Sequence, residues 1–156
     1  MTIVALFNDS LDLRVHEFSG VVAPGELRDL MEFYQNHPHL VGADLISLID
    51  ERAVADPALA ASLFTLREQF RGLQPSTQTA IVRRSVWVCS IPWALGLLGR
   101  FLERRHSRDG QGAEVRVVAA VAEASCLFED YELRAVERRE QFRQTFHSTA
   151  SVRLSR

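Results

Sequence analysis

The chain has 156 residues, of which 47% are hydrophobic and 24% charged, and its formal net charge is −2. A chain of this length forms one domain, and its near balance of charge provides no general attraction to nucleic acid or to an anionic membrane. Two cysteines do not make a disulfide framework. The longest apolar run, Ile91 to Leu98, is far shorter than the roughly 20 residues of a membrane span. The opening residues have no signal-peptide pattern, so we expect a soluble, cytoplasmic protein with no membrane span.

The first half of the sequence predicts a hairpin followed by alternating helices and strands. Two strands flank the turn-forming letters NDS, and in the second strand Arg14 and His16 alternate with apolar residues, which is typical of a half-buried strand. Pro24 opens a helix that ends before Pro38. The run Leu45–Ile49 hardly alternates, which favours a strand covered on both faces. Asp56-Pro57 is then a strong helix start, with the Asp56 carboxylate as a cap.

The second half continues the alternation. A strand is predicted from about Thr79 to Cys89, and a helix that begins at Pro92 follows it. The letters AEVRVVAAV alternate as a strand does, and AEASCLFED predicts a short helix. Strands and helices therefore alternate after an opening hairpin, which indicates an α/β domain with a mixed, mostly parallel sheet of four to five strands.

The last 26 residues differ in character from the rest. They hold more arginines than glutamates, and Leu133, Val136 and Phe142 form only a thin apolar seam. We therefore place a domain boundary near residue 130, with 1–130 as the α/β domain. Residues 131–156 are predicted to be an arginine-rich C-terminal extension that is partly helical with a frayed end and packs on the domain or on a second subunit.

With the elements in this order, the chain resembles the SpoIIAA-like branch of the STAS superfamily, to which anti-sigma-factor antagonists belong. The matching stretches are LRVHEFSGVVAPGELRDLMEF, RRSVWVCSIPWALGLLGRFLE and GAEVRVVAAVAEASCLFE, and the likeness covers roughly Ile3 to Glu129. It implies a small mixed sheet with helices packed mainly on one side. It also implies a role in protein interaction or ligand sensing rather than catalysis.

One functional feature of that family is missing from the sequence. The anti-sigma-factor antagonists carry a phosphorylatable serine where a helix begins after the third strand, whereas no serine or threonine occurs here between Ile49 and Ala61. Asp56 occupies the start of this helix, where a permanent carboxylate already interacts with the helix dipole. We therefore do not expect a phosphorylation switch at this place.

Cys89 is the candidate catalytic residue. It ends a strand just before a helix, where α/β sheets bind ligands and where a helix N-terminus can lower a thiol pKa. A phosphatase-type or rhodanese-type loop, however, needs small residues after the cysteine, and here Ile91 and Trp93 are bulky. We favour a buried structural thiol and keep a thiol enzyme that uses Cys89 as the alternative.

Other polar residues have simpler explanations than a site. His37 and His39 could contact a metal, but no second ligand cluster accompanies them. His16 and Glu17 could form an acid–base pair, yet adjacent residues on a strand point to opposite faces. Four arginines lie on the third predicted helix or just beyond it, where they would compensate the helix dipole: Arg100, Arg104, Arg105 and Arg108. Binding of nucleic acid or anionic lipid by these arginines is a further alternative.

These observations together predict a non-enzymatic module that binds a protein partner or an apolar small molecule, with a homodimer as one form it can take, and with no cofactor and no metal. The candidate binding residues are Asp56 and Trp93, at two helix starts, and Arg100 and Arg104 on the third helix.

Overall fold

The computed structural model describes residues 3–40, 44–62, 65, 83–103 and 114–148, with side chains omitted for 100–103 and 114. The strands are β1 (Ile3–Asn8), β2 (Leu13–Phe18), β3 (Val21–Val22), β4 (Asp44–Ile49), β5 (Val54–Ala55), β6 (Arg84–Val88), β7 (Glu114–Val118) and β8 (Arg143–His147). The helices are α1 (Pro24–Asn36), α3 (Pro92–Glu103) and α4 (Asp130–Arg138), with 3₁₀ turns η1 (Pro38–Leu40) and η2 (Val121–Cys126); residues 57–62 are also helical.

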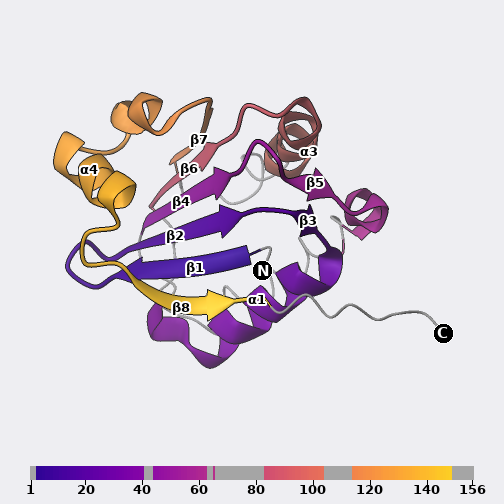
Figure 1. The fold of residues 1–156 in the computed structure, drawn as a ribbon, viewed down its shortest axis with the longest axis horizontal. Helices are drawn as coiled ribbons and strands as arrows, with labels where there is room; N and C mark the ends of the chain where they lie inside the picture. The colour runs from indigo at the N-terminus through magenta and orange to yellow at the C-terminus, as the bar shows by residue number, and fades with distance from the viewer. Residues whose placement is uncertain (1–2, 41–43, 63–64, 66–82, 104–113, 149–156) are drawn as a thin grey trace.

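Six of the strands form one mixed sheet in the order β7-β6-β4-β2-β1-β8. β2, β4, β6 and β7 pair in parallel, while β1 runs antiparallel to both of its neighbours. Figure 1 shows the four parallel strands side by side, with β1 and β8 completing the sheet at the other edge. The predicted α/β class and opening hairpin are confirmed, but the sheet has six strands instead of four to five. β3 and β5 form a separate parallel pair.

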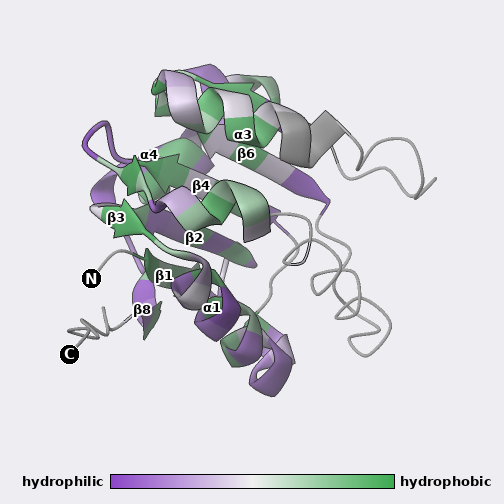
Figure 2. Ribbon diagram, turned by 90° about the vertical axis from the view of Figure 1, so that its right-hand side faces the viewer, coloured by the Kyte–Doolittle hydropathy of each residue, from purple (hydrophilic) through white to green (hydrophobic). Residues whose placement is uncertain are grey.

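The opening hairpin and α1 form for the reasons that the sequence indicates. At the hairpin turn, the Asn8 side chain accepts a hydrogen bond from the backbone N–H of Leu11 (3.1 Å), as turn-forming asparagines do. α1 begins at Pro24 and is closed by a capping box, in which the Glu26 carboxylate accepts the backbone N–H of Ala23 (3.1 Å). Figure 2 shows both hydrophobic and hydrophilic stretches on α1, as expected for a helix that covers a sheet.

Helices cover both faces of the sheet rather than mainly one. On the first face, α1 and the helical turn at 57–62 pack against apolar residues of β1 and β2, and α3 packs against β6 and β7. On the second face, η2 and α4 pack against β2, β4 and β6. Figure 1 shows α1 and α4 on opposite sides of the strands. Two layers of helices therefore enclose the sheet.

Covering both faces changes the environment of β2. The sequence predicted a half-buried strand whose polar residues face water, but Arg14 is 8% exposed and His16 is 6% exposed. That prediction was wrong because α1 covers the face to which they point, and Tyr34 of that helix contacts both side chains. Buried polar side chains thus face α1 at this part of the sheet.

The C-terminal residues take part in the same core. α4 lies within the range predicted to be partly helical, and its Leu133 and Val136 are buried against the second face of the sheet. β8 pairs with β1, and the buried Ser148 hydroxyl accepts the backbone N–H of Ile3 (2.9 Å) while it donates to the Glu26 carboxylate (2.7 Å). The chain up to residue 148 is therefore tied into the sheet. The predicted frayed end, 149–156, lies outside the described residues.

Candidate functional site

Five polar side chains gather on the first face of the sheet, and we call them the donor row: Arg14 and His16 of β2, Ser47 of β4, and Ser85 and Trp87 of β6. Strand register places them in two lines across the sheet. Arg14 pairs with Leu45, which pairs with Ser85, while His16 pairs with Ser47, which pairs with Trp87. Paired residues of neighbouring parallel strands point to the same face, and neighbouring strands are about 4.8 Å apart.

The face to which the donor row points is fixed by its neighbours along each strand. Leu13 and Val15 of β2 pack in the cluster under η2 and α4. Arg14 and His16 alternate with them along the strand and therefore point the opposite way, toward α1. Likewise Ile46 of β4 and Val86 of β6 pack under α4 and η2, which turns Ser47, Ser85 and Trp87 toward the first face. The donor row is therefore a consequence of strand alternation.

Arg14 is the buried cation of this face. Its guanidinium carbon lies 4.8 Å from the centre of the Tyr34 ring, and its side chain also interacts with the Tyr34 hydroxyl. Within the described residues no carboxylate pairs with Arg14, and its Nε atom is buried without a hydrogen-bond partner. Burial lowers the pKa of Arg14 from its ordinary value, because removal from water disfavours the charged form.

His16 is held as a neutral imidazole beside Arg14. Its Nε2 atom lies 2.7 Å from the Tyr34 hydroxyl. Burial, together with the positive charge of Arg14, holds the pKa of His16 well below its ordinary value of 6.5. At neutral pH the site therefore carries the single positive charge of Arg14.

The remaining members of the donor row lack partners as well. The hydroxyl oxygens of Ser47 and Ser85 and the Nε1 atom of Trp87 are buried, and none has a hydrogen-bond partner among the described residues. Ser47 is 0% exposed and Ser85 is 1% exposed. A buried polar group without a partner costs about 1–3 kcal/mol, and most such groups in proteins are paired. Four unpaired groups on one sheet face therefore need an explanation.

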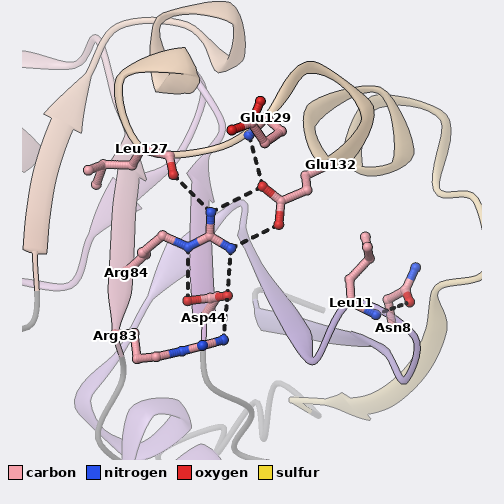
Figure 3. A network of polar contacts seen from close by, with 8 residues as sticks. All are labelled: Asn8, Leu11, Asp44, Arg83, Arg84, Leu127, Glu129 and Glu132. Carbon is pink, nitrogen blue, oxygen red and sulfur yellow. Dashed lines mark hydrogen bonds and ion pairs between the residues drawn. The ribbon is translucent and has the colours of Figure 1, made fainter.

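The opposite face shows how the same chain treats buried charge when it has only a structural role. Arg84 of β6 donates to both oxygens of Asp44 (3.1 and 2.7 Å) and to both oxygens of Glu132 (3.1 and 2.8 Å), and it also donates to the carbonyl of Leu127 (2.9 Å). Figure 3 shows this network, in which one guanidinium joins β4, β6 and α4. These hydrogen bonds raise the pKa of Arg84 above its ordinary range.

The structure places Cys89 in an apolar environment. It is 3% exposed, packs with Ala94, Leu98 and Val115, and its thiol donates weakly to the carbonyl of Ile91 (Sγ to O, 3.8 Å). The arrangement agrees with a buried structural thiol.

The predicted binding residues do not come together in one place. Asp56 caps the helical turn at 57–62 by accepting the backbone N–H of Ala58 (2.8 Å), and Trp93 donates its indole N–H to the carbonyl of Ala53 (3.1 Å). Both therefore have local structural partners. Arg100 lies in α3 without a described side chain, and Arg104 lies outside the described residues, as do Arg105 and Arg108.

Among the described residues, neither His37 with His39 nor His16 with Glu17 forms a site. The Nδ1–H of His37 donates to the carbonyl of Phe33 in its own helix (2.9 Å), and the imidazole stacks on the Phe33 ring. Across the described residues no group of three or more histidine, cysteine or acidic side chains could hold a metal. Glu17 pairs with Arg139 and His16 with Tyr34, on opposite sides of β2, as adjacent strand residues must.

No protein-family model, curated protein or solved structure matches this chain. Within the described ranges, no helix combines the length and the apolar character that crossing a membrane requires.

Sequence reasoning missed the donor row because polar residues on a strand normally face water. One signal was present. Ser47 interrupts the run Leu45–Ile49, which was itself predicted to be covered on both faces, so its hydroxyl had to be buried. The same reasoning applies to Ser85, which is followed by Val86 and Trp87.

Proposed function

We propose that this chain is a non-enzymatic module that binds a small molecule against the donor row. The observation that supports this proposal best is the set of buried, unpaired hydrogen-bonding atoms of Arg14, Ser47, Ser85 and Trp87 on one sheet face. Elsewhere in the part of the chain that the structure describes, buried polar groups are paired, as Asp44 and Ser148 illustrate. Natural proteins depart from this rule mainly at functional sites.

A bound molecule with hydrogen-bond acceptors would compensate the unpaired groups. Arginine and tryptophan side chains can only donate, and a serine hydroxyl can donate while it rotates to suit the acceptor. The site therefore offers donors in two lines across the sheet, which lie two residues, or about 6.6 Å, apart along the strands. A few convergent polar groups among apolar side chains are typical of small-molecule sites.

The STAS-like relationship and the cytoplasmic location are likewise proposals. The opening hairpin, followed by parallel strands alternating with helices, supports the relationship, although helices on both faces and the edge strand β8 differ from what the resemblance implied. Ligand sensing is one of the two roles that the resemblance implies, and the donor row favours it over a protein partner.

A ligand screen on matched variants tests this proposal. The full chain is screened by thermal unfolding against a chemically diverse set of neutral, acidic and basic small molecules. Compounds that raise the melting temperature are then titrated into S47A, S85A and the control S125A, whose serine is exposed and lies in η2.

We expect S47A and S85A to remain folded with unchanged or higher stability, since each removes an unpaired buried hydroxyl. Each should weaken binding of the compounds by about tenfold, the value of one hydrogen bond, while S125A binds as the wild type does. The proposal is wrong if no compound stabilises the chain, or if every stabilising compound binds S47A and S85A unchanged.

A further inference from the structure

We propose that the ligand of the donor row is a small monocarboxylate with an apolar body, and that its carboxylate pairs with Arg14. This inference deepens the proposed function and depends on it. It begins from Arg14, a buried guanidinium for which the described residues provide no carboxylate.

The buried carboxylates of the chain show that Arg14 is the exception. Asp44 and Glu132 share Arg84. Glu26 has a donor on each oxygen, the Ser148 hydroxyl and the backbone N–H of Ala23, and it lies in the first turn of α1, where the helix dipole favours negative charge. Each buried carboxylate among the described residues thus has its donors. A buried guanidinium without an anion is costly, and a bound anion would remove that cost.

The geometry around Arg14 suits a carboxylate. Its Nε–H is buried and unpaired, so this donor is left for a charge-assisted hydrogen bond to a carboxylate oxygen. Ser85 lies in the same line across the sheet, with only Leu45 between them, which places the two Cα atoms about 10 Å apart. The unpaired hydroxyl of Ser85 can donate to the same ligand from the far side of Leu45.

The charge of the site selects a monoanion. Arg14 contributes one positive charge, while His16 and Tyr34 are neutral neighbours: burial and Arg14 lower the pKa of His16, and burial raises the pKa of Tyr34. A carboxylate carries one negative charge, which Arg14 balances. A phosphate monoester carries about −1.5 to −2 at neutral pH and would bring uncompensated charge into the core.

Apolar side chains next to the donors select the rest of the ligand. Leu45 is 7% exposed and lies between Arg14 and Ser85. Further along β2 and β6, on the same face of the sheet, the rings of Phe18 and Trp87 stack with their centres 6.1 Å apart. A ligand that extends from Arg14 into this buried region contacts apolar carbon and aromatic rings, so we expect its body to be alkyl or aryl.

Calorimetric titration of the full chain tests this inference with matched probes. The acids are acetate, hexanoate, benzoate and 3-phenylpropionate. 3-Phenylpropionamide is the neutral counterpart, and phenyl phosphate is the dianionic one. Each is titrated into the wild type, R14M, R14K, S85A and the control R134M, which replaces an exposed arginine of α4 on the other face.

We expect 3-phenylpropionate or hexanoate to bind the wild type at least tenfold more tightly than acetate, the amide or phenyl phosphate. R14M should weaken that binding by about 10- to 100-fold, the range for a charge-assisted hydrogen bond. R14K keeps the positive charge but not the fork of donors, so its affinity should fall between those of the wild type and R14M. R134M should bind as tightly as the wild type does. If R14M does not fold, R14K and S85A still decide the result.

Three results would overturn the inference. Binding of the amide as tight as that of the acid would exclude a role for the charge, and tighter binding of phenyl phosphate would exclude a monoanion site; either result leaves the proposed function intact. Failure of every acid to bind would also refute it. If the wider screen then found a neutral ligand that depends on Ser47 or Ser85, the proposed function would survive, and if it found none, both would fail.

Discussion

Lowering the pH should destabilise this protein through His16. The imidazole is 6% exposed, its Nε2 atom contacts the Tyr34 hydroxyl at 2.7 Å, and Arg14 lies on the same face of β2. Burial first, and then the charge of Arg14, holds its pKa well below 6.5. The unfolded chain therefore binds a proton at this residue as the pH falls through 6.5, whereas the folded protein does not.

The sign and the size of the effect follow from that difference in proton binding. A group whose pKa is lower in the folded state destabilises the fold below its unfolded pKa, by about 1.4 kcal/mol for each pH unit. Between about pH 7.5 and 5.5, with 6.5 as the unfolded value, His16 alone should remove up to about 1.4 kcal/mol, the limit for a folded state that takes up no proton in this range. Stability should continue to fall until the folded pKa is reached.

Urea unfolding across this pH range measures the effect. H16Q keeps a polar group near Tyr34 but cannot take up a proton, so its loss of stability between the two pH values should be smaller than that of the wild type, by up to about 1.4 kcal/mol. H147Q, which changes an exposed histidine of β8, should follow the wild type. The reasoning would be refuted if H16Q and the wild type lost stability equally, because His16 would then titrate alike in both states.

Three further predictions concern the rest of the fold. Replacing Arg84 by Met removes the cation that Asp44 and Glu132 share and leaves only the exposed Arg83 beside Asp44, which should cost about 3–5 kcal/mol in urea unfolding. The same replacement of Arg83 should cost less than about 1 kcal/mol, and similar losses for the two variants would refute the central role of Arg84. S148A should cost about 1–3 kcal/mol, because two buried groups lose their partner, and an unchanged midpoint would contradict this. Iodoacetamide should label the exposed Cys126 in the native protein and Cys89 only after unfolding, as mass spectrometry of the peptides would show; rapid labelling of native Cys89 would revive the thiol-enzyme alternative.

Much of the fold could be predicted from local pattern. Period-two alternation correctly predicted the hairpin, and Pro24 and Pro92 correctly predicted where α1 and α3 begin. The apolar run of β4 predicted a strand covered on both faces, as observed. β8 could not be predicted in this way. Its letters RQTFH contain one large apolar residue, and it forms because β1 has an open edge to which the chain returns. Such long-range pairing leaves little trace in the local sequence.

The candidate site was hidden for a related reason. A pattern of alternating polar and apolar residues cannot show whether a helix covers the polar face, and in β2 it does. Arg14 and His16 therefore resembled solvent-facing residues, while Cys89 drew attention through its place at a strand end. In the structure Cys89 has apolar neighbours. Among the described residues, the buried unpaired side-chain groups belong to four members of the donor row: Arg14, Ser47, Ser85 and Trp87.

A high-resolution crystal structure of the wild-type chain, grown with 3-phenylpropionate, tests the central claim most directly. The account predicts density for the acid on the first face of the sheet, with its carboxylate within hydrogen-bonding distance of Arg14 Nε and its phenyl group against Phe18 or Trp87. Density there for water alone, or a protein carboxylate paired with Arg14, would contradict it.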